Sequence, residues 1–149
     1  MSDATPRSGW IRRLFGRRIR SVPLDPVRAD LVVVASCFDD AEACSTALDR
    51  GARTPPALDP AAEVLLRHHL RLPASEVEDA GAIAGQDGYV LAGEPAASDG
   101  QVDVLLQRVQ VLDALHCSQE RSRMAGLAQR SGGTVLGWDA LQPDPAPPQ

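Results

Sequence analysis

The spacing of apolar residues divides the chain after Val64 into alternating strands and helices. Apolar and polar residues alternate over Val64–Leu72, the period of two expected of a strand with one buried face. The residue patterns of three later segments also predict strands, at Tyr89–Ala92, Val102–Leu112 and Thr134–Trp138. In Val102–Leu112 the alternation changes phase at Leu105–Leu106, which predicts either a β-bulge or a fully buried stretch.

Two helices are predicted between these strands. Ser75 and Glu78 have the spacing of a capping box, which opens a helix that runs to about Gln86. Asp113–Arg130 has the strongest helical pattern in the chain, with its apolar residues on one side. Gly132–Gly133 ends this helix, because glycine readily adopts the left-handed conformation at a helix C-terminus.

The resulting order over residues 64–141 is β-α-β-β-α-β, which is the ferredoxin-like order. We therefore predict an α+β fold, an antiparallel sheet with two helices on one face. A strand at Leu31–Ala35 and a helix at Ala41–Asp49, capped by Asp39–Asp40 and ended by Gly51, form an N-terminal strand–helix addition. The predicted organisation is a basic amphipathic extension (1–22), a linker with the leading strand–helix unit (23–63), the ferredoxin-like domain (64–141) and a proline-rich disordered tail (142–149).

Charge is distributed unevenly along the 149 residues. The whole chain has a formal charge of −5, yet six arginines against Asp3 give residues 1–22 a charge of +5. The rest of the chain therefore carries −10. An acidic body repels phosphate, which argues against a domain that binds nucleic acid over its whole surface. Opposite charges in the two parts indicate two different partner surfaces, or an N-terminal segment that sometimes folds back on its own domain.

The arginine-rich segment is the first candidate site. As a helix, Trp10–Arg20 separates its apolar residues from most of its arginines. The residues predicted to contact an anionic partner are Trp10, Arg12, Arg13, Phe15, Arg17, Arg18 and Arg20. That partner is an anionic membrane surface, RNA or an acidic protein, and a merely solubilising tail is the remaining alternative. Only membrane binding should need the apolar side chains as well as the charges.

Cysteine count and hydropathy limit the class of protein. Cys37, Cys44 and Cys117 form no CxxC pair and are odd in number, so we expect buried reduced thiols rather than a zinc site or a disulfide framework. No apolar run is long enough for a transmembrane helix, and charges between residues 17 and 30 interrupt any signal peptide. We expect a cytoplasmic protein, peripheral to the inner face of the membrane if the arginine-rich segment binds lipid.

Few residues offer catalytic chemistry. His68 and His69 are neighbours on a strand and point to opposite faces, so they cannot bind one metal ion together. We expect His68 to be packed or hydrogen-bonded and His69 to be solvated. His116 and Cys117 diverge on a helix, which favours an inert buried thiol over a thiol–base pair. No phosphate-binding, dinucleotide-binding or hydrolase motif is present, and we expect no enzyme, no cofactor and no metal.

Three stretches between Leu65 and Trp138 resemble a known family. They are His68–Pro73, Asp87–Tyr89, and Met124–Arg130 with Gly132–Gly133 and then Gly137–Trp138. In these stretches the chain resembles the regulators of ribonuclease E activity, the RraB-type inhibitor family. The resemblance implies a ferredoxin-like, acidic, non-enzymatic protein that binds an endoribonuclease and modulates RNA decay. It also implies a structural signature made of Tyr89, Gly132, Gly133, Gly137 and Trp138.

Other functions stay open, because Thr134–Leu136 suits a buried strand better than a polar docking edge. One is a small-ligand sensor or adaptor module that uses the open face of the sheet. A pocket lined by His68 and Tyr89 would support that function, and a flat polar face would count against it. Another is an enzyme that uses His116 and Cys117. The sequence predicts no particular oligomeric state.

Overall fold

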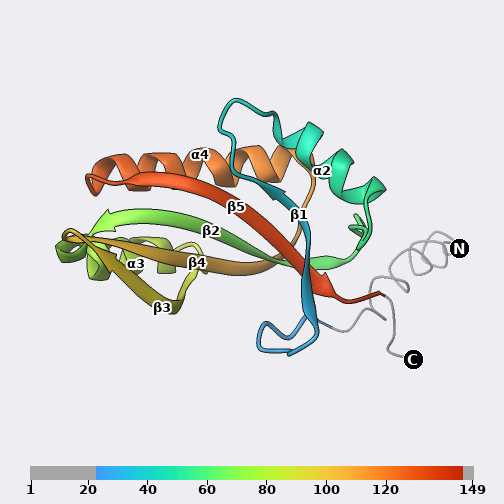
Figure 1. The fold of residues 1–149 in the computed structure, drawn as a ribbon, viewed down its shortest axis with the longest axis horizontal. Coiled ribbons are helices and arrows are strands. Elements are labelled where there is room, and N and C mark those ends of the chain that lie inside the picture. The colour runs from blue at the N-terminus through green and yellow to red at the C-terminus, as the bar shows by residue number, and fades with distance from the viewer. Residues whose placement is uncertain (1–22, 146–149) are drawn as a thin grey trace, which may run out of the picture.

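The computed structural model describes residues 23–145, which fold into a five-stranded antiparallel sheet and three α-helices (Figure 1). In chain order the elements are β1 (Leu31–Cys37), α2 (Cys44–Arg53), β2 (Glu63–Pro73), the 3-10 turn η1 (Ala74–Glu76), α3 (Val77–Gly85), β3 (Val90–Ser98), β4 (Gln101–Val111), α4 (Ala114–Arg130) and β5 (Thr134–Pro143).

The strands lie in the order β1-β5-β2-β4-β3, and all neighbouring pairs are antiparallel. The predicted α+β class and antiparallel sheet are therefore confirmed. The leading strand β1 joins this same sheet, where it forms the edge next to β5. With five strands in this order, the sheet does not match the predicted ferredoxin-like order exactly.

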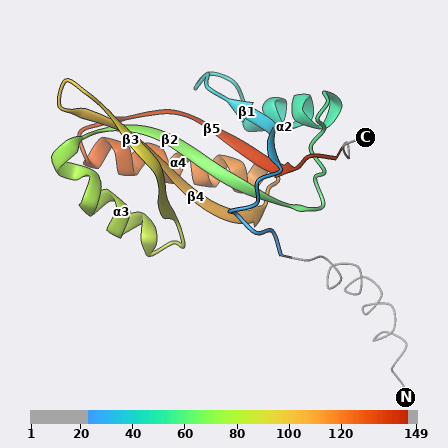
Figure 2. The same ribbon diagram turned by 60° about the horizontal axis from the view of Figure 1, so that its bottom comes forward.

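All three helices of residues 23–145 pack on one face of the sheet. Alternate residues of β2 face them and are buried, as the sequence pattern predicts: Val64, Leu66, His68, Leu70 and Leu72. The first two pack in a cluster with residues of α2 and α4, and the last two pack in a cluster with residues of α3 and α4. Helix α4 accordingly runs along the sheet between α2 and α3 (Figures 1 and 2).

The opposite, open face of the sheet carries charged side chains. Arg67 forms a two-pronged ion pair with Asp139, with both nitrogen–oxygen distances at 2.7 Å. His69 Nε2 lies 3.1 Å from the same carboxylate, so His69 is half-buried and hydrogen-bonded rather than solvated. Arg71 and Asp103 form a similar pair further along the face. These ion pairs make this part of the open face polar, which counts against a ligand site there.

Two predicted features of the first helix are wrong. Helix α2 begins at Cys44 instead of Ala41, because the Asp39 side chain bonds the Ala41 backbone N–H in a turn rather than capping a helix. Gly51 lies inside α2 and does not end it. A Cβ on Gly51 would lie 2.5 Å from the Val34 carbonyl oxygen, so this glycine allows the helix to approach β1 closely.

The predicted capping box is also wrong, and so is the bulge, the first of the two alternatives at Leu105–Leu106. Residues 74–76 form η1, and no side chain caps α3. Strand β4 pairs with β2 without a register shift, so no bulge occurs at Leu105–Leu106. Leu106 faces the helices and Leu105 is half-buried on the other face, which explains two adjacent apolar residues. Strand β3 continues past Ala92 to Ser98, and its pairing with β4 shifts between Ala92 and Ala96.

Both ends of α4 follow the prediction. The Asp113 side chain accepts a hydrogen bond from the His116 backbone N–H at 2.8 Å, and Gly132 has a φ of 77° just after the helix. Strand β5 is longer than predicted and runs to Pro143, so residues 142 and 143 belong to the sheet and not to a tail. The side-chain amide of Gln142 donates to the Asp59 carbonyl at 3.0 Å, which ties this end of β5 to the segment before β2.

Candidate functional site

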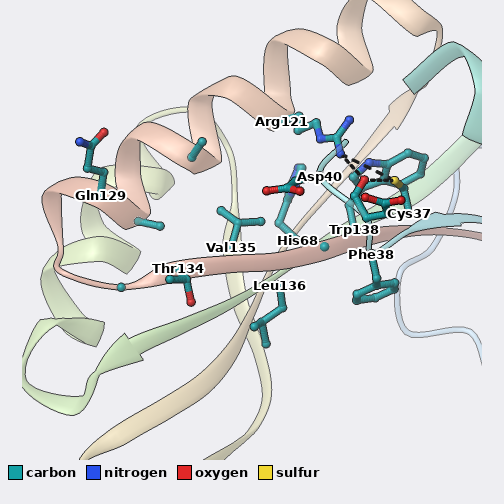
Figure 3. A pocket seen from close by; sticks show the side chains of 15 residues that line it. Cys37, Phe38, Asp40, His68, Arg121, Gln129, Thr134, Val135, Leu136 and Trp138 are labelled. Carbon is teal, nitrogen blue, oxygen red and sulfur yellow. Dashed lines mark hydrogen bonds between the residues drawn. The ribbon is translucent and has the colours of Figure 1, made fainter. Parts of the chain in front are cut away.

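A cavity of about 350 Å³ lies between α4 and the first half of β5, and we call it the α4–β5 pocket (Figure 3). Its apolar wall residues include Phe38, Ala125, Ala128, Val135, Leu136 and Trp138. Its polar and glycine residues include Asp39, Asp40, His68, Arg121, Gln129, Gly133, Thr134 and Gly137. A cavity of this size with apolar walls and a few polar groups is typical of small-molecule sites in proteins.

The pocket borders an open edge of β5. Strand β1 pairs with β5 only as far as Cys37, which lies opposite Trp138. Residues Thr134–Gly137 pair with β2 on one side, and no strand of residues 23–145 covers their other edge. Figure 3 shows Val135 on the α4 side of this edge and Leu136 on the opposite side. Residues 134–136 form a strand, as predicted, but Thr134 is exposed and the next two residues are half-buried, because the pairing of β1 with β5 ends at Cys37.

Two glycines of the predicted signature allow close backbone approach around the pocket. A Cβ on Gly133 would overlap the Arg71 carbonyl oxygen of β2, and a Cβ on Gly137 would overlap the Phe38 ring. Gly133, Gly137 and Trp138 all line the pocket. Gly132 follows the adjacent end of α4, and Tyr89 reaches the site through its contact with His68. The structure therefore brings the signature residues into one region.

Trp138 is a fully buried side chain in the pocket wall. It is 1% exposed, and its Nε1–H has no hydrogen-bond partner within the described residues. In Figure 3 the nitrogen edge of the ring is turned toward Arg121. A buried polar group without a partner costs about 1–3 kcal/mol and is uncommon in folded proteins. The indole N–H is therefore an unused hydrogen-bond donor that is itself buried, on a residue that lines the pocket.

His68 lies next to Trp138, because the two residues are opposite each other in the β2–β5 register. It lines the same pocket and is 1% exposed. Burial lowers the pKa of His68 to about 4, so its ring is neutral near pH 7. The prediction that His68 is packed or hydrogen-bonded is confirmed, since the side chain is buried and its Nε2 lies 3.4 Å from the Tyr89 hydroxyl oxygen.

A buried network fixes the Tyr89 hydroxyl. This group donates to Glu120 Oε1 at 2.7 Å, and the Arg108 guanidinium lies 4.5 Å from the centre of the Tyr89 ring. Glu120 also pairs with Arg108 at 3.2 Å and with Arg123 at 3.1 Å. Burial opposes ionisation of Glu120, but the Tyr89 hydrogen bond and the charge of Arg108 outweigh it and lower the pKa of Glu120. The acceptor of the Tyr89 proton is therefore a carboxylate near neutral pH.

This network determines which nitrogen of His68 carries the proton. Tyr89 has one hydroxyl proton, and because it is directed to Glu120, the Tyr89 oxygen can only accept from His68. The neutral ring then carries its proton on Nε2 and leaves Nδ1 as an acceptor. Among residues 23–145, Nδ1 has no hydrogen-bond partner. The pocket wall thus holds an unused acceptor on His68 next to the unused donor on Trp138.

Arg121 brings a positive charge to the pocket, but the chain already uses its two terminal nitrogens. They donate to the carbonyl oxygens of Glu42 and Asp39 at 2.6 and 2.8 Å. The same nitrogens lie 3.7 Å from the sulfurs of Cys44 and Cys37. These contacts fix the segment between β1 and α2 as one wall of the pocket.

His116 and Cys117 lie in different environments on α4. His116 is exposed, and its Nδ1 lies 2.7 Å from an Asp113 carboxylate oxygen at the start of α4. Burial and the neighbouring Cys44 raise the pKa of Cys117, which disfavours a thiolate. Cys37, Cys44 and Cys117 are all free and buried, as predicted. Within residues 23–145, no group of three or more His, Cys, Asp or Glu side chains is placed to hold a metal ion.

Three residues of this region were not predicted from the sequence as parts of a site. They are Glu120, Arg121 and Gln129. A signal exists for Glu120, because it lies three residues after Cys117 and four before Met124, on the apolar side of the helix. A charged residue at such a position indicates a buried partner. Arg121 and Gln129 carry no comparable signal, since polar residues are ordinary on an exposed helix face.

The arginine-rich candidate site, with Trp10 and Phe15, lies outside the described residues. Within residues 23–145, no helix is long and apolar enough to cross a membrane. No family model, no curated protein and no solved structure matches the chain. The geometry of the α4–β5 pocket therefore carries the functional argument.

Proposed function

We propose that the chain is a non-enzymatic regulatory protein that senses a small ligand in the α4–β5 pocket. One observation carries this proposal: the cavity of about 350 Å³ is lined by two buried side chains, Trp138 and His68, and neither Trp138 Nε1 nor His68 Nδ1 has a hydrogen-bond partner among residues 23–145. Such a combination is the usual form of a ligand site. The raised pKa of Cys117 supports binding over thiol catalysis.

We also propose that β2–β5 form a ferredoxin-like unit to which β1 and α2 are added. The strand order β5-β2-β4-β3, with antiparallel neighbours, supports this proposal. The added strand then has a functional consequence, because its end at Cys37 sets where the open edge of β5 begins.

Filling the pocket tests the proposed function. Ala125 lines the pocket from the exposed side of α4, so Ala125→Leu should occupy pocket volume without disturbing the core. Ser122→Leu places the same side chain at an exposed position of α4 outside the pocket, and is the matched control. Monocyclic aromatic compounds are titrated into the 15N-labelled full chain, and binding is read from the amide signals of Val135 and Leu136.

We expect to find compounds that bind the parent chain and the Ser122→Leu variant with equal affinity. The same compounds should bind the Ala125→Leu variant at least about tenfold more weakly, which is a loss of about 1.4 kcal/mol in binding free energy. Equal binding to all three proteins would place the compounds elsewhere and contradict the proposal. The same contradiction would follow if no compound moved the signals of residues 135 and 136.

A second proposal, contact with an endoribonuclease that modulates RNA decay, is favoured by the open edge of β5. An unpaired strand edge can accept a strand from a partner protein, and Gly133 and Gly137 flank this edge. The test measures binding of the full chain to purified ribonuclease E. Leu136→Lys should weaken binding, because an edge lysine opposes strand addition, whereas Ser122→Leu should not. No binding by the parent chain, or equal binding by both variants, would contradict this proposal.

A further inference from the structure

The unused polar atoms of the pocket wall indicate which class of ligand it takes. We infer that the α4–β5 pocket binds a neutral molecule with an apolar body and an amide-type edge. The ligand's carbonyl oxygen accepts from Trp138 Nε1–H, and its N–H donates to His68 Nδ1. This inference rests on the proposed ligand-binding function and adds the chemistry of the ligand.

The donor and the acceptor belong to neighbouring side chains. Trp138 and His68 are cross-strand partners, and both line the pocket. Directly opposed residues of an antiparallel pair have Cβ atoms about 4.5–5.5 Å apart. An amide-type edge presents an acceptor and a donor side by side, so one group of the ligand can satisfy both side chains. The inference also explains why a native structure leaves the Trp138 N–H without a partner within the described residues.

A carboxylate fits this wall poorly. It would accept from Trp138, but it would also face the lone pair of His68 Nδ1, which has no proton to offer near neutral pH. Asp39 and Asp40 are exposed and line the same pocket, so two negative charges further oppose an anion. The positive charge of Arg121 is already directed to two backbone carbonyls.

A cation fits no better. An ammonium group could donate to His68, but it would have to lie beside the Trp138 N–H and the Arg121 guanidinium, which both repel it. The rest of the cavity is bounded by Phe38, Ala125, Val135 and other apolar groups. A neutral, planar and largely apolar molecule therefore meets both the polar and the apolar requirements.

Three benzene derivatives of similar size separate these possibilities. Benzamide has the donor and the acceptor, benzoate has only acceptors and a negative charge, and toluene has neither. Each is titrated into the 15N-labelled full chain, and the indole N–H signal of Trp138 is followed. The chain has two tryptophans, so Trp10→Phe identifies the Trp138 signal.

Benzamide should shift the Trp138 indole proton downfield and bind at least about tenfold more tightly than toluene, as two added hydrogen bonds would allow. Benzoate should bind at least about tenfold more weakly than benzamide. Trp138→Phe keeps a ring but removes the donor, so it should weaken benzamide binding and leave toluene binding unchanged. If this variant does not fold, the indole shift and the three parent-chain affinities still decide the question.

Two outcomes overturn the inference and leave the ligand-binding function standing. In one, toluene and benzamide bind with equal affinity, sensitive to Ala125→Leu, and the indole proton does not shift. In the other, benzoate binds as tightly as benzamide. If none of the three probes binds in a manner sensitive to Ala125→Leu, the inference and the proposed function both fail.

Discussion

Burial of single polar residues makes the stability of this protein depend on pH. The folded-state pKa of His68 is about 4, below its ordinary value of 6.5. Between these pH values the unfolded chain binds a proton at residue 68 that the folded chain does not, so stability falls as the pH falls through this window. His68 alone should therefore make the free energy of unfolding, measured with urea, about 2 kcal/mol lower at pH 5 than at pH 7.

Two histidine variants isolate this effect. His68→Gln should lose most of the decrease between pH 7 and pH 5, because no group at position 68 then titrates in this window. His116→Gln replaces an exposed histidine and should retain the decrease. If stability decreased by the same amount in both variants, the pH dependence would come from titratable groups other than His68.

Burial also separates two otherwise similar ion pairs on the open face of the sheet. Arg67–Asp139 and Arg71–Asp103 are both two-pronged, but the Asp139 side chain is 7% exposed and the Asp103 side chain 40%. Asp139→Asn should lower the free energy of unfolding by about 2 kcal/mol, less than for a fully buried pair because Arg67 is partly exposed. Asp103→Asn should cost much less, and urea unfolding at pH 7 compares the two. Equal losses would show that burial is not the deciding factor.

At the scale of the elements, the α4–β5 connection depends on a glycine that has no room for a side chain. A Cβ on Gly133 would overlap the Arg71 carbonyl oxygen, and this backbone atom cannot move without shifting β2. Gly133→Ala should therefore destabilise the fold by about 1–3 kcal/mol. Gly85→Ala meets nothing within 4 Å and should be neutral or slightly stabilising in the same thermal or urea unfolding experiment. Equal stability of the two variants would contradict this account of the connection.

The elements also show how far local sequence patterns reach. The alternation of Val64–Leu72 and the periodicity of Asp113–Arg130 predict β2 and α4 within one or two residues, because each pattern reflects a single buried face. The predictions based on Gly51 and Ser75 are wrong, because neither residue type has a single structural role. A glycine can end a helix or lie inside it, and a serine before a helix does not always cap it. Helix α2 continues past Gly51, and this glycine serves a close contact with the backbone of β1. A contact between two separate elements leaves no sign in the local sequence pattern.

At the scale of the whole molecule, the pocket illustrates what sequence can and cannot predict. The resemblance selects Gly133, Gly137 and Trp138, and the structure places all three in the pocket wall. The cavity itself depends on where β1 ends relative to β5 and on where Arg121 holds the following segment. These are relations between distant parts of the chain, and no local period encodes them. The donor on Trp138 and the acceptor on His68 likewise become visible only through the strand register.

The division of charge between residues 1–22 and the rest of the chain predicts two independent binding functions. Among residues 23–145, those that line the pocket all lie between 37 and 138, so we expect the pocket not to depend on the arginine-rich segment. Replacing Arg12, Arg13, Arg17, Arg18 and Arg20 by glutamine in the full chain tests this. We expect the parent chain to co-sediment with vesicles of phosphatidylserine and phosphatidylcholine at low salt, and the substituted chain to remain in the supernatant.

The expected size of this effect is large, because each arginine near an anionic bilayer contributes about 1 kcal/mol and salt screens the attraction. Trp10→Ala with Phe15→Ala should also weaken vesicle binding, whereas binding of an RNA or an acidic protein would need only the charges. Benzamide affinity should stay within about twofold of the parent in the glutamine-substituted chain, since a twofold change is only about 0.4 kcal/mol. A larger change would mean that the basic segment and the pocket act on each other, and the two surfaces would then have to be treated as one site.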